Sequence, residues 1–163
     1  MLIALKAIPD SKALNMKKFS SQIQLFLRLA IGVGYLVPGL DRLGVWGKPG
    51  EKNISWGDWS HFIDYAKQIM SFLPAALVNI FAVMATACEL SFGILLIIGQ
   101  WTRFAATGSG VLSFLFAISM TISFGIVSPL SYSVFTVSAA SFLLAAIPEY
   151  KYSLDNLKRS TTK

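Results

Sequence analysis

Residues 75–99 read AALVNIFAVMATACELSFGILLIIG, and this stretch decides the fold. Its only charged residue is Glu89. A bilayer core about 30 Å thick needs roughly 20 apolar residues of helix, so the stretch is long enough to cross a membrane. Backbone N–H and C=O groups cannot stay unpaired in lipid, so a lone spanning segment has to be helical. We therefore expect an integral membrane protein.

Three further segments have the same character, at about residues 23–40, 104–127 and 130–147. Of the 163 residues, 55% are hydrophobic and only 13% are charged, and the mean hydropathy is +0.62. Soluble domains carry about a quarter charged residues. We predict an all-α fold, an integral membrane four-helix bundle that forms a single domain over residues 23–147.

The segments around the spans complete this prediction. Residues 1–22 and 148–163 are expected to be tails, and translation can start at Met1 or at Met16. We expect Pro38 to kink or end the first span, and Ser128-Pro129 to form a tight turn between the third and fourth spans.

Basic residues gather on one side of the predicted membrane domain. Lysines precede the first span, Arg103 lies in the link between the second and third, and lysines and an arginine follow the fourth. The positive-inside rule then predicts that both termini are cytoplasmic. The net charge of +6 forms no basic patch among aromatic residues, so we expect no nucleic-acid partner. With one cysteine and one histidine, we expect no metal site.

The loop over residues 41–74 contains a further predicted helix. Apolar residues recur there at helical spacing, with Asp58 placed as a possible N-cap: Trp59, Phe62, Ile63, Ala66, Ile69, Met70 and Leu73. We predict an amphipathic interfacial helix on the outer side. It lies either on the membrane surface or as a lid packed over the bundle, and the sequence leaves both alternatives open.

Charged residues inside spans are costly, so each needs a reason. Glu89 shares a small, polar helical face with Thr86 and Gly93, and Arg28 shares one with Gly32 and Tyr35. At 1.5 Å per residue, Arg28 lies about 9 Å and Glu89 about 15 Å from the cytoplasmic surface. We therefore predict an Arg28–Glu89 ion pair, direct or bridged by water.

Three other charged residues are candidates for ion pairs or ligand contacts. Arg103 is a second possible partner of Glu89. Asp41 and Arg42 form either a local surface pair or a gate at the mouth of a site. Glu89 has two possible roles. In the first it handles protons or anchors a ligand, which makes it the catalytic candidate. In the second it only holds helices together with its partner. The sequence leaves these alternatives open.

Small residues predict where helices pack closely. The third span carries an almost wholly small face, and Gly32 and Gly93 extend this character to the first two spans. The third-span face consists of Ala106, Gly110, Ser113, Ala117, Thr121 and Gly125.

Two groups of residues resemble the DoxX family of bacterial and archaeal membrane proteins. One is Leu27-Arg28-Leu29-Ala30 with Gly39-Leu40-Asp41-Arg42-Leu43, where the family typically has Arg and then Gly-x-x-Lys-Leu. The other is Glu89-Leu90-x-x-Gly93 with Gly99-Gln100-x-Thr102-Arg103, which is similar to the family's acidic second span and Gly-x-x-Thr-Arg turn. Pro38 stands where many members carry histidine, and Arg42 replaces the usual lysine.

The resemblance implies a four-helix bundle in the bacterial inner membrane and, as for some members, a role in redox complexes. The family name comes from a subunit associated with thiosulfate:quinone oxidoreductase. Our leading expectation is a small subunit of a respiratory or thiol-redox complex, with quinone bound in the bundle by Tyr35, Glu89 and Arg28. We expect no cofactor built into the chain, and the partners would be the lipid bilayer, other membrane or redox subunits, or a second copy.

Two other functions stay open. One is a non-catalytic accessory or assembly subunit that docks through the small face of the third span. The other is a transporter of a small solute with Glu89 as the coupling site. The sequence has no P-loop, dinucleotide fingerprint or nucleophile elbow, and whether the protein is an enzyme stays undecided.

Overall fold

The computed structural model describes residues 11–161, and within that range the chain forms helices and no strand. Three helices are long and apolar enough to cross a membrane: the Lys18–Asp41 part of α1, α3 and α4. A shorter apolar helix, α6, accompanies them. The predicted all-α membrane bundle is therefore confirmed.

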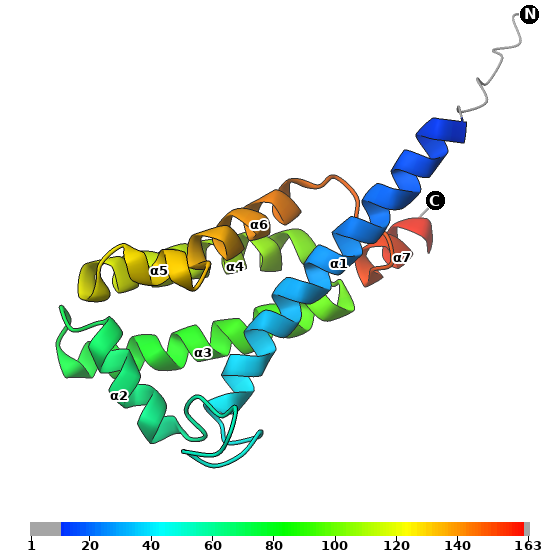
Figure 1. Cartoon of the computed structure of the whole chain (residues 1–163). Coiled ribbons are helices and arrows are strands. Elements are labelled where there is room, and N and C mark those ends of the chain that lie inside the picture. The colour runs from blue at the N-terminus through cyan, green and yellow to red at the C-terminus, as the bar shows by residue number, and fades with distance from the viewer. Residues whose placement is uncertain (1–10, 162–163) are drawn as a thin grey trace, which may run out of the picture.

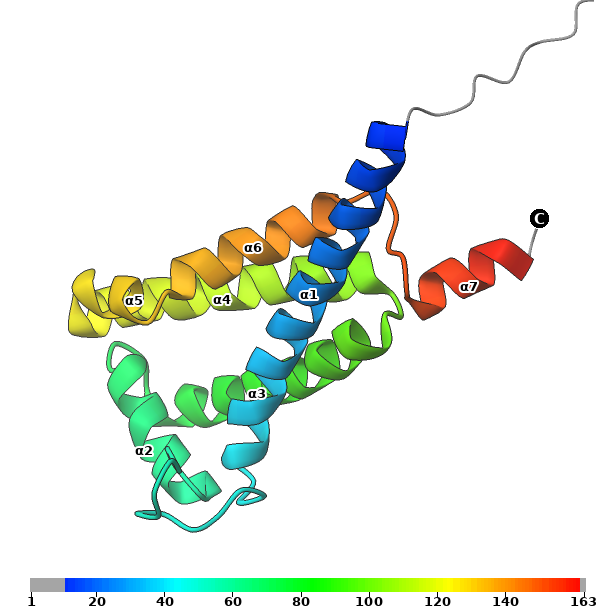
Figure 2. The ribbon, with the colours of Figure 1, turned by 45° about the vertical axis from the view of Figure 1, so that its right-hand side comes forward.

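The helices pack as two pairs. Helix α1 (Ser11–Asp41) lies along α3 (Ala75–Ile98), and α4 (Thr102–Phe124) lies along α6 (Val134–Ala146). Figure 1 and Figure 2 show α1 crossing the other three helices diagonally, while α2 (Trp59–Ile69) closes one end of the bundle. The two pairs contact each other mainly through α3 and α4, and this contact is smaller than the contact within either pair.

Glycines bring α1 and α3 close together. A Cβ atom added at Gly32 would lie 3.0 Å from the carbonyl oxygen of Gly93, and one added at Gly93 would lie 3.0 Å from that of Gly32. One added at Gly39 would lie 2.8 Å from the side chain of Leu90. The helix backbones therefore meet along one seam, with Gly32 opposite Gly93 and Gly39 opposite Leu90.

The small face of α4 is used inside the bundle. Ser138 of α6 donates a hydrogen bond to the carbonyl of Gly110, and the ring of Phe142 packs over the same glycine. Ala117 is fully buried. Thr121 donates to the carbonyl of Ala117 within its own helix. Helix α6 therefore covers the part of this face around Gly110, so the face serves helix packing, as its small residues predict.

Helix α1 is longer than the predicted first span. It begins at Ser11 and passes through Pro38 to end at Asp41. The predicted tail over residues 1–22 is therefore helical from Ser11, and residues 1–10 of it lie outside the described range. A helix of 31 residues is about 46 Å long, which exceeds the bilayer core. The diagonal course of α1 and its extension beyond the bundle accommodate this length (Figure 1).

The predicted fourth span is interrupted, and the predicted Ser128-Pro129 turn is wrong. The chain turns at Gly125, whose φ is +81°, and residues 128 and 129 lie inside the short helix α5 (Val127–Ser131). Ser133, with φ at +56°, separates α5 from α6. Proline fits the first turn of α5 because its nitrogen needs no intrahelical acceptor there.

The C-terminal segment returns to the α3–α4 turn. Helix α7 (Leu154–Thr161) begins beside it, and the Asp155 carboxylate accepts hydrogen bonds from the backbone N–H groups of Trp101 (2.9 Å) and Thr102 (2.8 Å). The backbone N–H of Asp155 donates to the carbonyl of Gly99 at 3.0 Å. The side chain thus satisfies orphan N–H groups at the start of α4.

Replacing Gly32 with alanine tests the α1–α3 seam. The new methyl group would meet the backbone of Gly93, so Gly32→Ala should lower the thermal unfolding midpoint in detergent. Overpacking of this kind costs about 1–3 kcal/mol. Gly34→Ala is the matched control, since nothing lies within 4 Å of the added atom. That change should be neutral or stabilising, by up to about 1 kcal/mol. Equal midpoints for the two variants would contradict the seam.

Replacing Asp155 with asparagine tests the anchoring of α7. Burial opposes the charged form of Asp155, but hydrogen bonds from Thr102 and Trp101 outweigh it and lower the carboxyl pKa. The anchoring is therefore present at neutral pH and is lost as the pH falls through this lowered pKa. Asp155→Asn should cost about 1 kcal/mol. Hydrogen exchange at residues 99–102 should speed up, and unchanged protection there would exclude the capping role.

Candidate functional site

A buried ion pair joins the end of α1 to the middle of α3. Nη1 of Arg42 lies 2.7 Å from Oε2 of Glu89, and Nη2 donates to Oε1 at 3.3 Å. Nη1 also donates to the hydroxyl of Thr86 at 3.0 Å. Both charged side chains are only 5% exposed. Two parallel contacts between a guanidinium and a carboxylate form a strong, directional pair.

Aromatic rings from the loop and α2 cover the other side of Arg42. Its guanidinium carbon lies 4.0 Å from the ring centre of Phe62 and 5.0 Å from that of Trp56. Cations over aromatic faces are attracted by the ring quadrupole, more strongly when water is excluded. Arg42 therefore contacts three parts of the chain, namely α3, the loop and α2.

The predicted Asp41–Arg42 surface pair is wrong, because both side chains are buried and face different partners. Oδ2 of Asp41 accepts hydrogen bonds from the backbone N–H groups of Ser55 (3.1 Å) and Trp56 (2.9 Å). This holds the loop against the end of α1, and places Trp56 over Arg42.

The predicted Arg28–Glu89 pair is wrong as well. Nη2 of Arg28 donates to the carbonyl of Tyr152 at 2.6 Å, near the α3–α4 turn. Helix α1 begins at Ser11 and crosses α3 at an angle (Figure 1), so distance along the sequence does not give the relative depth of Arg28 and Glu89. In the actual register Gly39 lies against Leu90, so the end of α1 comes level with Glu89.

Tyr35 and Arg103 also have partners other than those predicted. The Tyr35 hydroxyl donates to the carbonyl of Ser109 at 2.6 Å and lies 2.6 Å from the hydroxyl of Ser113. It therefore links α1 to α4. Arg103 is not a partner of Glu89, because its guanidinium points to the carbonyl of Ile147 at 3.4 Å.

Helix α2 packs over the bundle as a lid. Of the two predicted positions, on the membrane surface or over the bundle, the second is therefore the one observed. The α2 face of Phe62, Ala66 and Ile69 is buried, and the first two pack with Val78 and Ala82 of α3. Asp58 caps the helix, as predicted, by accepting a hydrogen bond from the backbone N–H of His61 at 2.8 Å.

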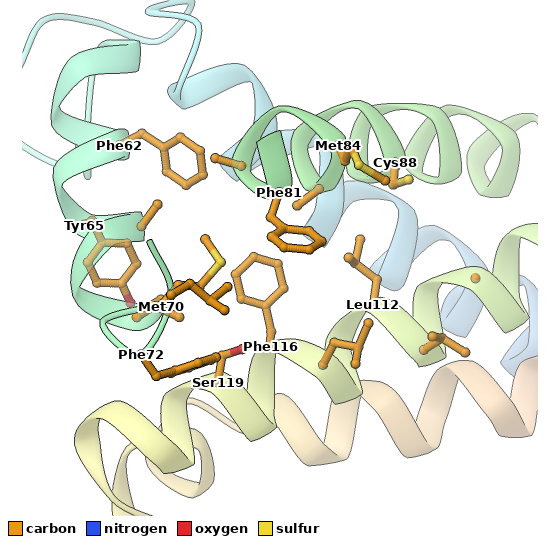
Figure 3. A pocket seen from close by; sticks show the side chains of 18 of the residues that line it. Phe62, Tyr65, Met70, Phe72, Phe81, Met84, Cys88, Leu112, Phe116 and Ser119 are labelled. Atoms are coloured by element: carbon orange, nitrogen blue, oxygen red, sulfur yellow. The ribbon is translucent and has the colours of Figure 1, made fainter. Parts of the chain in front are cut away.

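Under this lid lies an apolar cavity of about 560 Å³ between α2, α3 and α4. Figure 3 shows side chains from the three helices facing this common space. Ligand sites typically measure about 300–1,000 Å³ and are lined mainly by apolar and aromatic residues. The rings in the lining are those of Phe62, Tyr65, Phe72, Phe81, Phe92 and Phe116, and both Met70 and Met84 add thioether sulfurs.

Few polar groups face this cavity. The lining includes the hydroxyls of Tyr65 and Ser119 and the thiol of Cys88. Burial raises the pKa of Tyr65, so its phenol stays a neutral hydrogen-bond donor. Among the described residues, no side chain or backbone group forms a hydrogen bond with either hydroxyl. The cavity thus combines an apolar body with two available hydroxyls.

The predicted ligand-binding residues do not line this cavity. Tyr35, Glu89 and Arg28 are absent from the lining and bond to other parts of the chain. Phe62 connects the two regions, because its ring both covers Arg42 and forms part of the cavity wall.

Comparison with known proteins agrees with this geometry and with the sequence motifs. The DoxX family model matches residues 23–124, well over half of the chain. The chain belongs to the DoxX family. The DoxX match runs from residue 23, within α1, to the end of α4, and therefore includes the ion pair, the lid and the cavity lining. No curated protein and no solved structure matches the chain.

Sequence reasoning missed the cavity lining of this DoxX protein. On α3 the lining residues Phe81, Met84, Cys88 and Phe92 recur along one face. Because α3 is apolar all round, no change of polarity marks that face. The one sequence feature that pointed to the lining was the predicted apolar face of α2, which supplies Phe62 and Ile69 to the cavity wall.

Replacing Glu89 with glutamine tests the ion pair. Glu89→Gln leaves the buried guanidinium of Arg42 without a counter-charge, which costs about 3–5 kcal/mol. We expect a large drop in the thermal unfolding midpoint in detergent, partly recovered in Arg42→Met/Glu89→Leu. Asp64→Asn, which breaks the exposed Asp64–Lys67 pair, should change stability by less than about 1 kcal/mol. If Glu89→Gln were as stable as the wild type, the pair would not hold the fold.

Proposed function

We propose that this DoxX protein is a small membrane subunit of a respiratory or thiol-redox complex, and that it binds quinone in the cavity under α2. The single observation that carries the proposal is the cavity, which is built almost entirely from apolar and aromatic side chains of membrane helices and the lid. Arg28, Tyr35 and Glu89 do not contact the proposed quinone, because they lie outside the cavity lining.

A quinone matches the chemistry of the lining. Its flat ring can stack against aromatic side chains, and its carbonyl oxygens accept hydrogen bonds. Tyr65 and Ser119 supply hydroxyl donors, and the remaining wall suits an isoprenoid tail. Because the cavity lies between spanning helices, such a ligand would enter sideways from the bilayer, where it is dissolved.

Reduction of a quinone to a hydroquinone takes two electrons and two protons. The sequence carries no dinucleotide fingerprint, so we assign the electron donor to a partner subunit. The partner would be another membrane or redox protein, and a second copy of this chain can also contribute.

The proposed location is the bacterial inner membrane, with both termini cytoplasmic. The distribution of Lys and Arg supports this orientation. In Figure 1 the first turns of α1, the α3–α4 turn and α7 lie toward the same end of the bundle, as the orientation requires.

Cys88 is a built-in probe of the cavity, because it is the chain's only cysteine and lies in the lining. We expect a fully substituted short-chain quinone, which cannot alkylate thiols, to slow labelling of Cys88 by a membrane-permeant maleimide about tenfold at saturation. The physical reason is that an occupied cavity excludes the reagent. Mass spectrometry of the purified protein in detergent measures the labelled fraction.

The matched control moves the thiol by one position. In Cys88→Ala/Ala87→Cys the thiol stands on the exposed side of α3, outside the lining. The quinone should not protect it. Equal labelling of Cys88 with and without quinone would contradict the proposal. Equal protection by a saturated alkyl phospholipid of the same length would also contradict it, since the cavity would then not select a quinone.

A further inference from the structure

A second groove lies at the opposite end of the bundle from the lid. It has a volume of about 850 Å³ and runs between the first turns of α4, the segment that follows α6, and α7. Figure 2 shows α7 projecting from the bundle beside the α3–α4 turn. Because α3 ends and α4 begins here, the groove lies where two spans leave the bilayer core.

Basic side chains stand on two walls of this groove. Arg103 comes from the first turn of α4, and Lys158 comes from α7. Asp155 also lines the groove, but both of its oxygens already accept backbone N–H groups at the start of α4. Lys158 also attracts the Asp155 carboxylate, and together with Arg103 the two cations outnumber this one carboxylate, so the lining is net positive.

Aromatic residues extend the groove toward the membrane. Trp101 and Phe104 line it and are each 64% exposed, although both are large and apolar. Tryptophan is enriched at the level of lipid headgroups, where one side of the ring is apolar and the other meets water. Thr107 continues the lining one turn further along α4, in the direction of the bilayer core.

We propose that this groove binds the phosphate headgroup of an anionic phospholipid. Arg103 and Lys158 hold the phosphate, Asn156 adds a polar contact, and the first acyl carbons lie against Trp101 and Phe104. Basic pockets at the cytoplasmic ends of spanning helices suit such headgroups. The lipid would tie α7 and the α3–α4 turn to the membrane surface. The site is separate from the cavity under α2, so it does not depend on quinone binding.

Native mass spectrometry of the full-length protein in detergent tests this site. The protein is titrated with dioctanoyl phosphatidylglycerol or with dioctanoyl phosphatidylcholine. We expect clear preference for phosphatidylglycerol. Each basic side chain near an anionic headgroup contributes about a fivefold change in affinity, so Arg103→Gln/Lys158→Gln should weaken phosphatidylglycerol binding about 25-fold. Phosphatidylcholine binding should stay the same.

The matched control is Lys48→Gln/Lys52→Gln, which removes the same charge from exposed positions in the loop near α2. It should keep the preference. The site is overturned if the wild type binds both lipids equally, if the control loses as much affinity, or if soluble glycerol phosphate displaces the lipid at equal concentration. Should the double variant not fold, Lys158→Gln alone should cost about fivefold, and no loss there would overturn the site.

Discussion

The guanidinium of Arg42 can be buried in this membrane protein only because three parts of the chain neutralise and cover it. Glu89 supplies the opposite charge, Thr86 a further acceptor, and the rings of Phe62 and Trp56 exclude water. Removing any one partner of a buried charge pair leaves an uncompensated charge, which is far more costly than an exposed pair. The end of α1, the loop, α2 and α3 are therefore fixed relative to one another.

This constraint also shapes the cavity. The lid α2 is held from one side by Arg42 under Phe62, and from the other by its apolar face on α3. Phe62 belongs to both regions, so a ligand in the cavity would contact the ring that covers the ion pair. Glu89 pairs with Arg42 and is not among the residues that line the proposed site. A lone carboxylate in a span would first suggest a ligand contact, but here a buried guanidinium already engages it.

The helical membrane fold was predictable from the sequence because length and hydropathy determine it almost alone. The sequence also pointed to Glu89 as a buried charge that needs a partner, to the cap at Asp58 and to the amphipathic face of α2, since each breaks a local pattern. The identity of the partner of Glu89 could not be predicted, because it depends on how far α1 extends and how it crosses α3. The break at Ser133 depends on tertiary packing, and the cavity lining lies on helices that are apolar on every side.

The proposed quinone in the cavity under α2 is tested by the quinone content of the protein purified from native membranes in mild detergent. We expect stoichiometric quinone in the wild type. We expect loss of quinone in Ala85→Trp, which fills the lining, and retention in Ala87→Trp, which lies on the exposed side of the same helix. Protein that carries only phospholipid, or equal quinone in both variants, would contradict the proposal.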